Sequence, residues 1–358
     1  MTSFAEPTGV SARFALGTFS IAGGETFPGI VVGDRVLAFS ALGVLLSATG
    51  SEVLCNAPSL LAVLERWEEN EPLLSRAAES IQEDTAGTRA HPLTPLEAVR
   101  VHAPVLPRQI FCSGANYRKH VIDLIIDQPS PQMEKLTPQE RRSFAEKVMD
   151  ERAAHGKPFV FTKIASSVTG PFDPIVLPYD VRQPDWELEL GVVIGKAARR
   201  VKRMDALGCV AGYVIVNDIT SRDLVYRRDV PQMGMDWLAC KSAPTFLPVG
   251  PYLVPSALVP DPQNLQITLK LNGEIKQDER TADMIFDVAQ LIEHISSYVQ
   301  LLPGDLICTG SPAGNGTHYD RYLRDGDVLE GSISGLGTQT NACVAERTGE
   351  EHGPRLPV

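Results

Sequence analysis

The stretch Asp185-Trp186-Glu187-Leu188-Glu189-Leu190-Gly191-Val192-Val193-Ile194-Gly195 alternates acidic and apolar side chains in its first half. A period of two is typical of a β-strand, whose successive side chains point to opposite faces. Glu187 and Glu189 are therefore predicted to share one face, while the apolar residues between them point into a core. Two carboxylates this close repel each other unless water or a cation separates them, and oxygen ligands of this kind select Mg²⁺, Mn²⁺ or Ca²⁺. The alternative is the solvated face of an edge strand.

A third acidic residue, Asp218, follows a second predicted strand. The run Gly212-Tyr213-Val214-Ile215-Val216-Asn217-Asp218 is mostly apolar, and the polar segment Thr220-Ser221-Arg222-Asp223 comes next. The end of a strand is a place where a fold can present a metal ligand, although Asp218 could instead be a turn residue that caps the strand. Together with the glutamate pair, it favours a site for a hard divalent cation.

Six motifs in one order resemble the fumarylacetoacetate hydrolase family across residues 109–346. No single motif is specific, but the whole order covers more than half of the chain. The motifs are Gly114-Ala115-Asn116-Tyr117-Arg118-Lys119-His120, Phe161-Thr162-Lys163, Glu187 with Glu189, Asn217-Asp218, Lys241, and Thr309-Gly310-Ser311-Pro312-Ala313-Gly314.

The resemblance implies an α+β, β-rich fold. A mixed β-sandwich roll of the fumarylacetoacetate hydrolase type would carry the site, and a smaller N-terminal α/β domain would precede it. The implied metal ligands are Glu187, Glu189 and Asp218, with Mg²⁺ or Mn²⁺ as the cofactor. The family also implies a homodimer.

His120 and Asp123 are the predicted catalytic pair. They stand one helical turn apart, so on a short helix Asp123 could fix the tautomer of His120, which would act as a general base. Members of the family commonly have Glu where this chain has Asp123, so the pair is kept with a shorter side chain. Without the resemblance, a surface pair would be the better interpretation.

Lys241 is the third predicted catalytic residue, because an ammonium held by the acids could steady a metal-bound water or a developing enolate. A lysine whose ammonium reaches the surface is the alternative. Arg222 could contact a substrate carboxylate or could simply neutralise Asp223. The remaining predicted substrate-binding residues come from the family motifs; they are Tyr117, Lys163, Thr309 and Gly310. Some members carry Gln where this chain has Val225, so a Gln-mediated substrate contact is not expected.

The chain is predicted to divide into an N-terminal domain (1–105), a catalytic domain (106–347) and a C-terminal tail (348–358). Strands are expected around residues 14–21, 29–32 and 35–37, the last two joined by a Gly33-Asp34 turn. Helices are expected at 60–67 behind Ser59, from Thr137 to Gly156, and at 287–302. Residues 83–93 look like an exposed connection, and 124–157 like a long lid or insertion.

Composition excludes several classes of function. The net charge is −11 and no long basic stretch occurs, which disfavours a nucleic-acid partner. The six cysteines form no Cys-x-x-Cys pair, and no apolar run of about 18 residues suggests a membrane span. We expect reduced thiols, no membrane association and a cytoplasmic location. Residues 310–316 lack the features of a phosphate-binding loop, and Ser311 is not in a Gly-x-Ser-x-Gly motif.

The predicted function is divalent-metal-dependent hydrolysis of a C–C bond in a small 1,3-diketone or 2,4-dioxo acid, through a stabilised enolate. A 2-oxo acid decarboxylase acting on a substrate like oxaloacetate, or a hydratase or isomerase, is the alternative on the same scaffold. A silent binding protein and a metal-independent thiol or serine hydrolase are two further alternatives. The residues predict the electrostatics of the site better than the bond that is broken.

Overall fold

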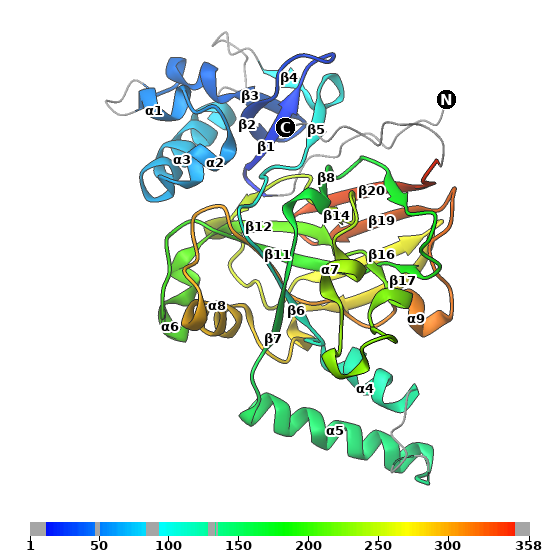
Figure 1. The fold of residues 1–358 in the computed structure, drawn as a ribbon. Coiled ribbons are helices and arrows are strands. Elements are labelled where there is room, and N and C mark those ends of the chain that lie inside the picture. Colours follow the sequence, from blue (N-terminus) through cyan, green and yellow to red (C-terminus); the bar gives the residue numbers. More distant parts are fainter. Residues whose placement is uncertain (1–11, 47–50, 84–92, 128–132, 134, 348–358) are drawn as a thin grey trace.

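The computed structural model describes residues 12–46, 51–83, 93–127, 133 and 135–347 (Figure 1). Within them, the N-terminal part forms an antiparallel sheet of order β4-β3-β2-β1-β5 with three helices beside it. Its elements are β1 (Ala15–Ser20), β2 (Phe27–Val32), β3 (Arg35–Ala38), α1 (Ser51–Cys55), α2 (Leu60–Leu64), α3 (Trp67–Glu83), β4 (Thr94–Pro95) and β5 (Arg100–His102).

The predicted hairpin is confirmed, because Val32 pairs with Arg35 across Gly33-Asp34, and Gly33 has a positive φ of 61°. Ser59 caps α2 as predicted, with its side chain accepting from the Ala62 N–H. The expected single helix is however two helices, because α2 ends at Leu64 and α3 begins at Trp67. The predicted connection at 83–93 lies almost entirely outside the described residues, as does the whole C-terminal tail.

The larger part of the chain contains two sheets that face each other. A six-stranded sheet has the order β15-β12-β11-β18-β6-β7, and a five-stranded sheet the order β17-β16-β19-β20-β9. The strands of the first are β6 (Ile110–Gly114), β7 (Phe159–Lys163), β11 (Leu188–Ile194), β12 (Val210–Asn217), β15 (Val254–Pro255) and β18 (Leu306–Cys308). Those of the second are β9 (Ile175–Leu177), β16 (Gln266–Leu271), β17 (Glu274–Arg280), β19 (Val328–Ile333) and β20 (Gly337–Ala345).

Shorter elements complete this body. Two further strand pairs are β8 (Val168–Thr169) with β14 (Leu247–Pro248), and β10 (Pro184–Asp185) with β13 (Thr220–Ser221). The helices are α4 (Arg118–Asp127), α5 (Pro138–His155), α6 (Arg203–Ala206), α7 (Trp237–Lys241), α8 (Val288–Tyr298) and α9 (Gly316–Tyr319). The mixed, strand-rich α+β class predicted from the sequence is confirmed.

Two helices test the predicted boundaries. α5 begins with the predicted capping box, in which Thr137 and Glu140 each accept the other's backbone N–H. α8 has a second capping box, formed by Asp287 and Gln290, but ends at Tyr298 rather than near residue 302. The prediction was too long because Leu301 pairs its backbone with Ala198, with both hydrogen bonds at 2.9 to 3.0 Å, and so leaves the helical path.

β11 lies in the middle of the six-stranded sheet, hydrogen-bonded to β12 and β18, and is buried on both faces. Leu188 and Leu190 belong to the core cluster that β16 and β19 of the second sheet also line. Val193, on the other face, packs in a core with N-terminal residues such as Leu16 and Trp67. The edge-strand alternative for the acidic face is therefore wrong.

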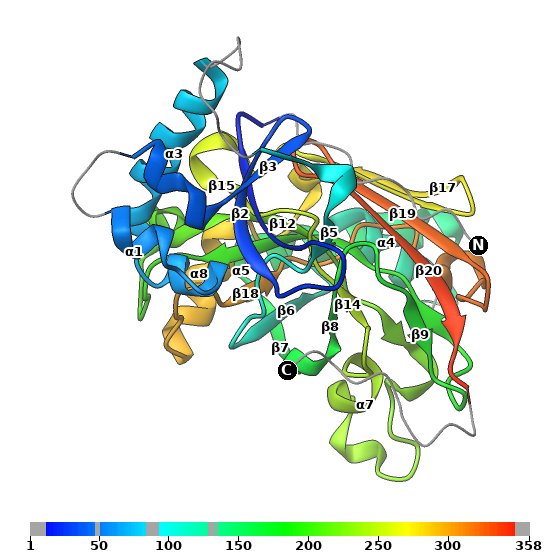
Figure 2. The same cartoon turned by 90° about the horizontal axis from the view of Figure 1, so that it is seen from above.

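The N-terminal part forms a layer above the six-stranded sheet in Figure 1, which Figure 2 shows from above, and its residues belong to both core clusters. Leu16 of β1 and Leu253 also exchange two backbone hydrogen bonds, of 2.8 and 2.9 Å. The predicted division near residue 105 stays a prediction. Both core clusters contain residues from either side of it. α4 and α5 lie at the far end from this layer in Figure 1. No helix in the described part of the chain has the length and apolar character needed to cross a bilayer.

Candidate active site

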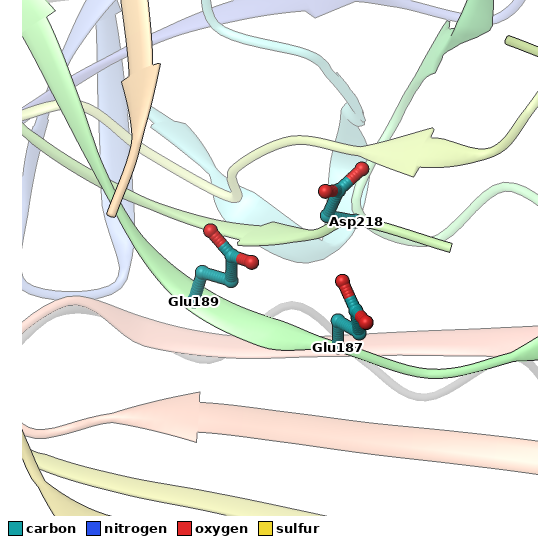
Figure 3. A group of neighbouring side chains, drawn as sticks. All are labelled: Glu187, Glu189 and Asp218. Atoms are coloured by element: carbon teal, nitrogen blue, oxygen red, sulfur yellow. The ribbon is translucent and has the colours of Figure 1, made fainter. Parts of the chain in front are cut away.

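The three predicted metal ligands come together where β11 begins and β12 ends. Glu187 precedes β11, Glu189 lies in it, and Asp218 follows β12, whose Asn217 pairs with Leu188. One carboxylate oxygen from each acid lies within 4.8 Å of the others, and all three side chains are buried. Figure 3 shows the side chains directed into one shared space. The alternation in the sequence thus placed both glutamates correctly.

Cationic side chains surround two of these acids. Lys241 Nζ lies 2.6 Å from Glu187 and 2.5 Å from Asp218, and Lys163 Nζ lies 2.6 Å from Asp218. Arg222 pairs with Glu187 and also with Asp185, the latter at 2.7 Å. Burial alone would raise the pKa of Glu187, but Arg222 and Lys241 lower it to about 2. Glu187 and Asp218 therefore have strong ionic partners.

Glu189 has no ion pair within the described residues. Its carboxylate accepts one hydrogen bond, of 2.7 Å, from the Gly310 backbone N–H, although only 2% of the residue is exposed. Burial raises its pKa well above the usual range, and the nearby Asp218 raises it further. A buried carboxylate is costly without a counter-charge. An all-oxygen set of three carboxylates with one uncompensated charge fits a hard divalent cation.

A cavity of about 400 Å³ opens over the three acids. His120 of α4, Arg222 and Lys241 line it with them. An aromatic wall completes it, since Phe161 and Trp237 stack with ring centroids 4.2 Å apart, and Lys241 Nζ lies 5.3 Å from the Phe161 centroid. The cavity therefore combines an acidic floor, a potential base and an apolar side.

His120 reaches this cavity, whereas Asp123 lines an adjoining cavity of about 330 Å³ that His120 also borders. Burial lowers the pKa of His120 to about 4, with Glu187 opposing and Arg222 adding to the shift. The ring is therefore neutral at neutral pH and able to accept a proton. No hydrogen bond joins His120 to Asp123 in the described part of the chain. The orienting role of Asp123 stays a prediction.

Arg222 lines the cavity, as predicted. The alternative prediction, that Arg222 neutralises Asp223, is wrong. It pairs with Asp185 and Glu187, while Asp223 accepts hydrogen bonds of 3.0 and 3.2 Å from the backbone N–H groups of Arg182 and Gln183. The reason is geometric, because β10 and β13 pair directly and bring Arg222 beside Asp185.

Four residues predicted to bind substrate lie behind the cavity rather than in its wall. Lys163 is fully buried and its Nζ donates to Asp218 and to the Phe246 and Ile219 carbonyls. The Thr309 hydroxyl donates to the Leu190 carbonyl, and the Gly310 N–H donates to Glu189. Lys163, Thr309 and Gly310 were expected to contact the substrate. They instead hydrogen-bond to the predicted metal ligands or to the strand that carries them.

Tyr117 is the fourth of these residues. Its side chain is fully buried in the core, where its hydroxyl has no hydrogen-bond partner among the described residues. It does not border the cavity, because the backbone of Tyr117 pairs with Met284 just before α4 begins. Tyr117 therefore does not line the cavity in which it was predicted to contact the substrate.

Asp185 is a site residue that the sequence interpretation missed. It is fully buried, holds Arg222 at 2.7 Å, and accepts from the Thr317 backbone and hydroxyl at 3.3 and 3.1 Å. The signal was available, because residues 185, 187 and 189 share one face of an extended chain. Asp185 thus anchors the arginine that in turn neutralises Glu187.

Comparison with known proteins agrees with this geometry. The model of the fumarylacetoacetate (FAA) hydrolase C-terminal family matches residues 109–344. The chain belongs to the fumarylacetoacetate hydrolase family. The human mitochondrial oxaloacetate tautomerase is 36% identical over 256 residues, which cover 71% of this chain and 72% of that protein. A 2,4-didehydro-3-deoxy-L-rhamnonate hydrolase from a Sphingomonas species is 47% identical over 186 residues, 51% of this chain and 64% of that protein.

Solved structures of the fumarylacetoacetate hydrolase family share the fold. The fumarylacetoacetate hydrolase from Exiguobacterium antarcticum has a TM-score of 0.67 at 28% identity, covering 93% of this chain and 100% of that one. A maleylpyruvate hydrolase from a Sphingobium species, solved with manganese(II) and pyruvate, has a TM-score of 0.65 at 26% identity, with the same coverage. These relatives include a tautomerase and several hydrolases. Membership of the family therefore indicates an enzyme but does not specify which reaction it catalyses.

Proposed function

We propose that this protein is a divalent-metal-dependent hydrolase that cleaves the C3–C4 bond of a small 2,4-dioxo acid. The carrying observation is a neutral histidine, His120, in the same cavity as three carboxylates suited to a hard cation. The hydrolase with 47% identity supports the proposal, because the name of its substrate places carbonyl groups at C2 and C4 on either side of a deoxygenated C3.

The chemistry divides between a cation and the side chains. Mg²⁺ or Mn²⁺ held by Glu187, Glu189 and Asp218 would polarise the carbonyl oxygens of the substrate. His120 removes a proton from water as it attacks the C4 carbonyl. The C3–C4 bond then breaks with its electron pair going to C3, which gives a carboxylic acid and an enolate that takes up a proton to become pyruvate. Lys241 adds positive charge where the enolate forms.

Oxaloacetate tautomerisation or decarboxylation is the second candidate. Human oxaloacetate tautomerase matches 71% of this chain, a longer stretch than the rhamnonate-type hydrolase. Tautomerisation moves a proton at C3 and needs a base but no attacking water, and decarboxylation needs neither. A hydratase or isomerase reaction uses the same enolate chemistry. All of these reactions share the acids. His120 separates decarboxylation, which needs no base, from hydrolysis and tautomerisation, which both need one, and the products separate the last two.

The test is His120→Ala, assayed with Mg²⁺ on an acylpyruvate and on oxaloacetate. If water attack is the chemistry, acylpyruvate hydrolysis should slow by about 10²- to 10⁴-fold, the usual contribution of a positioned base. Oxaloacetate decarboxylation should change far less, and stabilisation by the metal should persist. Asp123→Asn should be less damaging than His120→Ala. His155→Ala, at the exposed end of α5, is the matched control. Unchanged hydrolysis in His120→Ala would overturn the hydrolase.

We also propose that the enzyme is a cytoplasmic homodimer whose chain divides into an N-terminal domain (1–105) and a catalytic domain (106–347). The family resemblance supports the dimer. Light scattering after size-exclusion chromatography tests the dimer, and limited proteolysis near residue 105 tests the division. Comparing Mg²⁺ with Mn²⁺ in the same assays decides which cation supports turnover.

A further inference from the structure

Neutral polar side chains with no partner gather on one side of the cavity. Asn315 is only 2% exposed, yet its side-chain amide makes no hydrogen bond within the described residues. The Tyr322 hydroxyl is likewise unpaired there, and both residues border the main cavity and the adjoining one beside His120. Buried polar groups are nearly always hydrogen-bonded, so an unpaired amide facing a cavity indicates a ligand.

The charges nearby define what that ligand can be. The two basic side chains of the main cavity, Arg222 and Lys241, are already paired with acids of the site. The described lining of the adjoining cavity contains Asp123 and Asp320 beside His120 and His318, and no lysine or arginine. A carboxylate placed there would meet two negative side chains, whereas a hydroxyl would find an amide and a phenol. The surroundings therefore favour an uncharged, hydrogen-bonding group.

We propose that Asn315 and Tyr322 bind a hydroxyl group on the acyl end of the substrate, so that this enzyme selects hydroxylated 2,4-dioxo acids. This inference rests on the proposed hydrolase, in which His120 acts at C4. The acyl end begins at C4, and Asn315 and Tyr322 border both cavities that His120 borders. The acid that leaves is then a hydroxy acid, and the other product is pyruvate.

The test compares three acylpyruvates that differ only in the acyl end. Acetylpyruvate ends in a methyl group, glycolylpyruvate in a hydroxymethyl group and succinylpyruvate in a carboxylate. We expect kcat/KM to be about tenfold higher for glycolylpyruvate than for acetylpyruvate, since one neutral hydrogen bond is worth about that factor. Succinylpyruvate should be the poorest substrate.

Two variants assign the effect to residues. Asn315→Val and Tyr322→Phe remove groups that make no hydrogen bond to the described part of the chain, so both proteins should fold. Each should lower kcat/KM for glycolylpyruvate by up to about tenfold and leave acetylpyruvate unchanged. Tyr319→Phe is the matched control, because the Tyr319 hydroxyl donates to the Lys276 carbonyl and borders neither cavity. Equal losses on both substrates, or a preference for succinylpyruvate, would overturn the inference.

A failure of the hydrolase itself is distinguishable from a failure of this inference. If none of the three compounds is cleaved, they become ligands whose dissociation constants calorimetry can measure. Glycolylpyruvate should then bind about tenfold more tightly than acetylpyruvate, and Asn315→Val should abolish that difference. Equal affinities would refute the hydroxyl site independently of turnover.

Discussion

Replacing Glu189 by glutamine should leave the metal-free protein folded while abolishing its response to metal. Glutamine keeps an oxygen that can accept the Gly310 N–H and removes a buried carboxylate that has no ion pair among the described residues. Glu187→Gln is the contrasting change, because Glu187 pairs with both Lys241 and Arg222. The two substituted glutamates are only two residues apart, but Glu187 has cationic partners and Glu189 has a backbone N–H instead.

The magnitudes follow from those partners. Removing one member of a buried ion pair typically costs about 3 to 5 kcal/mol, because it leaves the other charge uncompensated. Because Lys241 keeps Asp218 and Arg222 keeps Asp185, we expect Glu187→Gln to lose less than that, about 1 to 3 kcal/mol of unfolding free energy without metal. Glu189→Gln strands no cation, and removing such a group can be nearly neutral or stabilising. In the parent protein, metal at about 100 times its dissociation constant should add about 2.7 kcal/mol.

The assay is urea unfolding followed by circular dichroism, with EDTA and then with Mg²⁺ or Mn²⁺. The gain on adding metal should disappear in both variants, and only Glu187→Gln should have a lower midpoint in EDTA. The unfolding slope should be unchanged, since the exposed area is the same. A Glu189→Gln protein as unstable in EDTA as Glu187→Gln, or one that still gains from metal, would refute the charge assignment.

Two further predictions concern buried or partly buried basic groups. Lys163→Gln should cost about 1 to 3 kcal/mol of metal-free stability, because Asp218 loses one of its two buried partners and keeps Lys241; in urea unfolding, the exposed Lys196→Gln should scarcely move the midpoint. Burial, with help from Arg100, lowers the pKa of His102, so the unfolded chain binds protons more readily and stability should fall as pH drops below about 6.5. In urea unfolding at about pH 7.5 and about pH 5.5, His102→Gln should lose less stability than the parent; an identical loss would show that His102 is not responsible.

The sequence could predict the carboxylate triad because two simple regularities carry it. The period of two placed Glu187 and Glu189 on one face, and the end of an apolar run placed Asp218. The supporting cations were harder to predict. Lys163 and Asp218 are 55 residues apart, and Lys163 ends β7 whereas Asp218 follows β12, with three strands between them in the sheet, so only the tertiary fold brings them together. A motif can mark such a lysine as relevant but cannot say whether it faces the substrate or the ligand.

The same reasoning explains the errors at the boundaries. α8 ends early because a distant segment at Ala198 captures the backbone of Leu301, and local periodicity contains no information about that segment. The sequence likewise contained no signal that Val193 and Trp67 belong to one core. A strand that is buried on both faces has an apolar sequence in either case, whether its second face packs against a helix of the same domain or against a preceding domain. The sequence of β11 therefore could not show that N-terminal residues pack on it.

The charges of the site connect the metal to the substrate. Four buried carboxylates lie against three basic side chains, so ionisation of Glu189, whose pKa burial raises well above its usual range, leaves one negative charge uncompensated. A 2,4-dioxo acid is itself an anion, and the side chains by themselves would repel it. A divalent cation changes the sign of the site, so that the same pocket attracts the carboxylate it would otherwise exclude. No lysine or arginine in the described part of the chain pairs with Glu189, and this is what makes substrate binding depend on the metal.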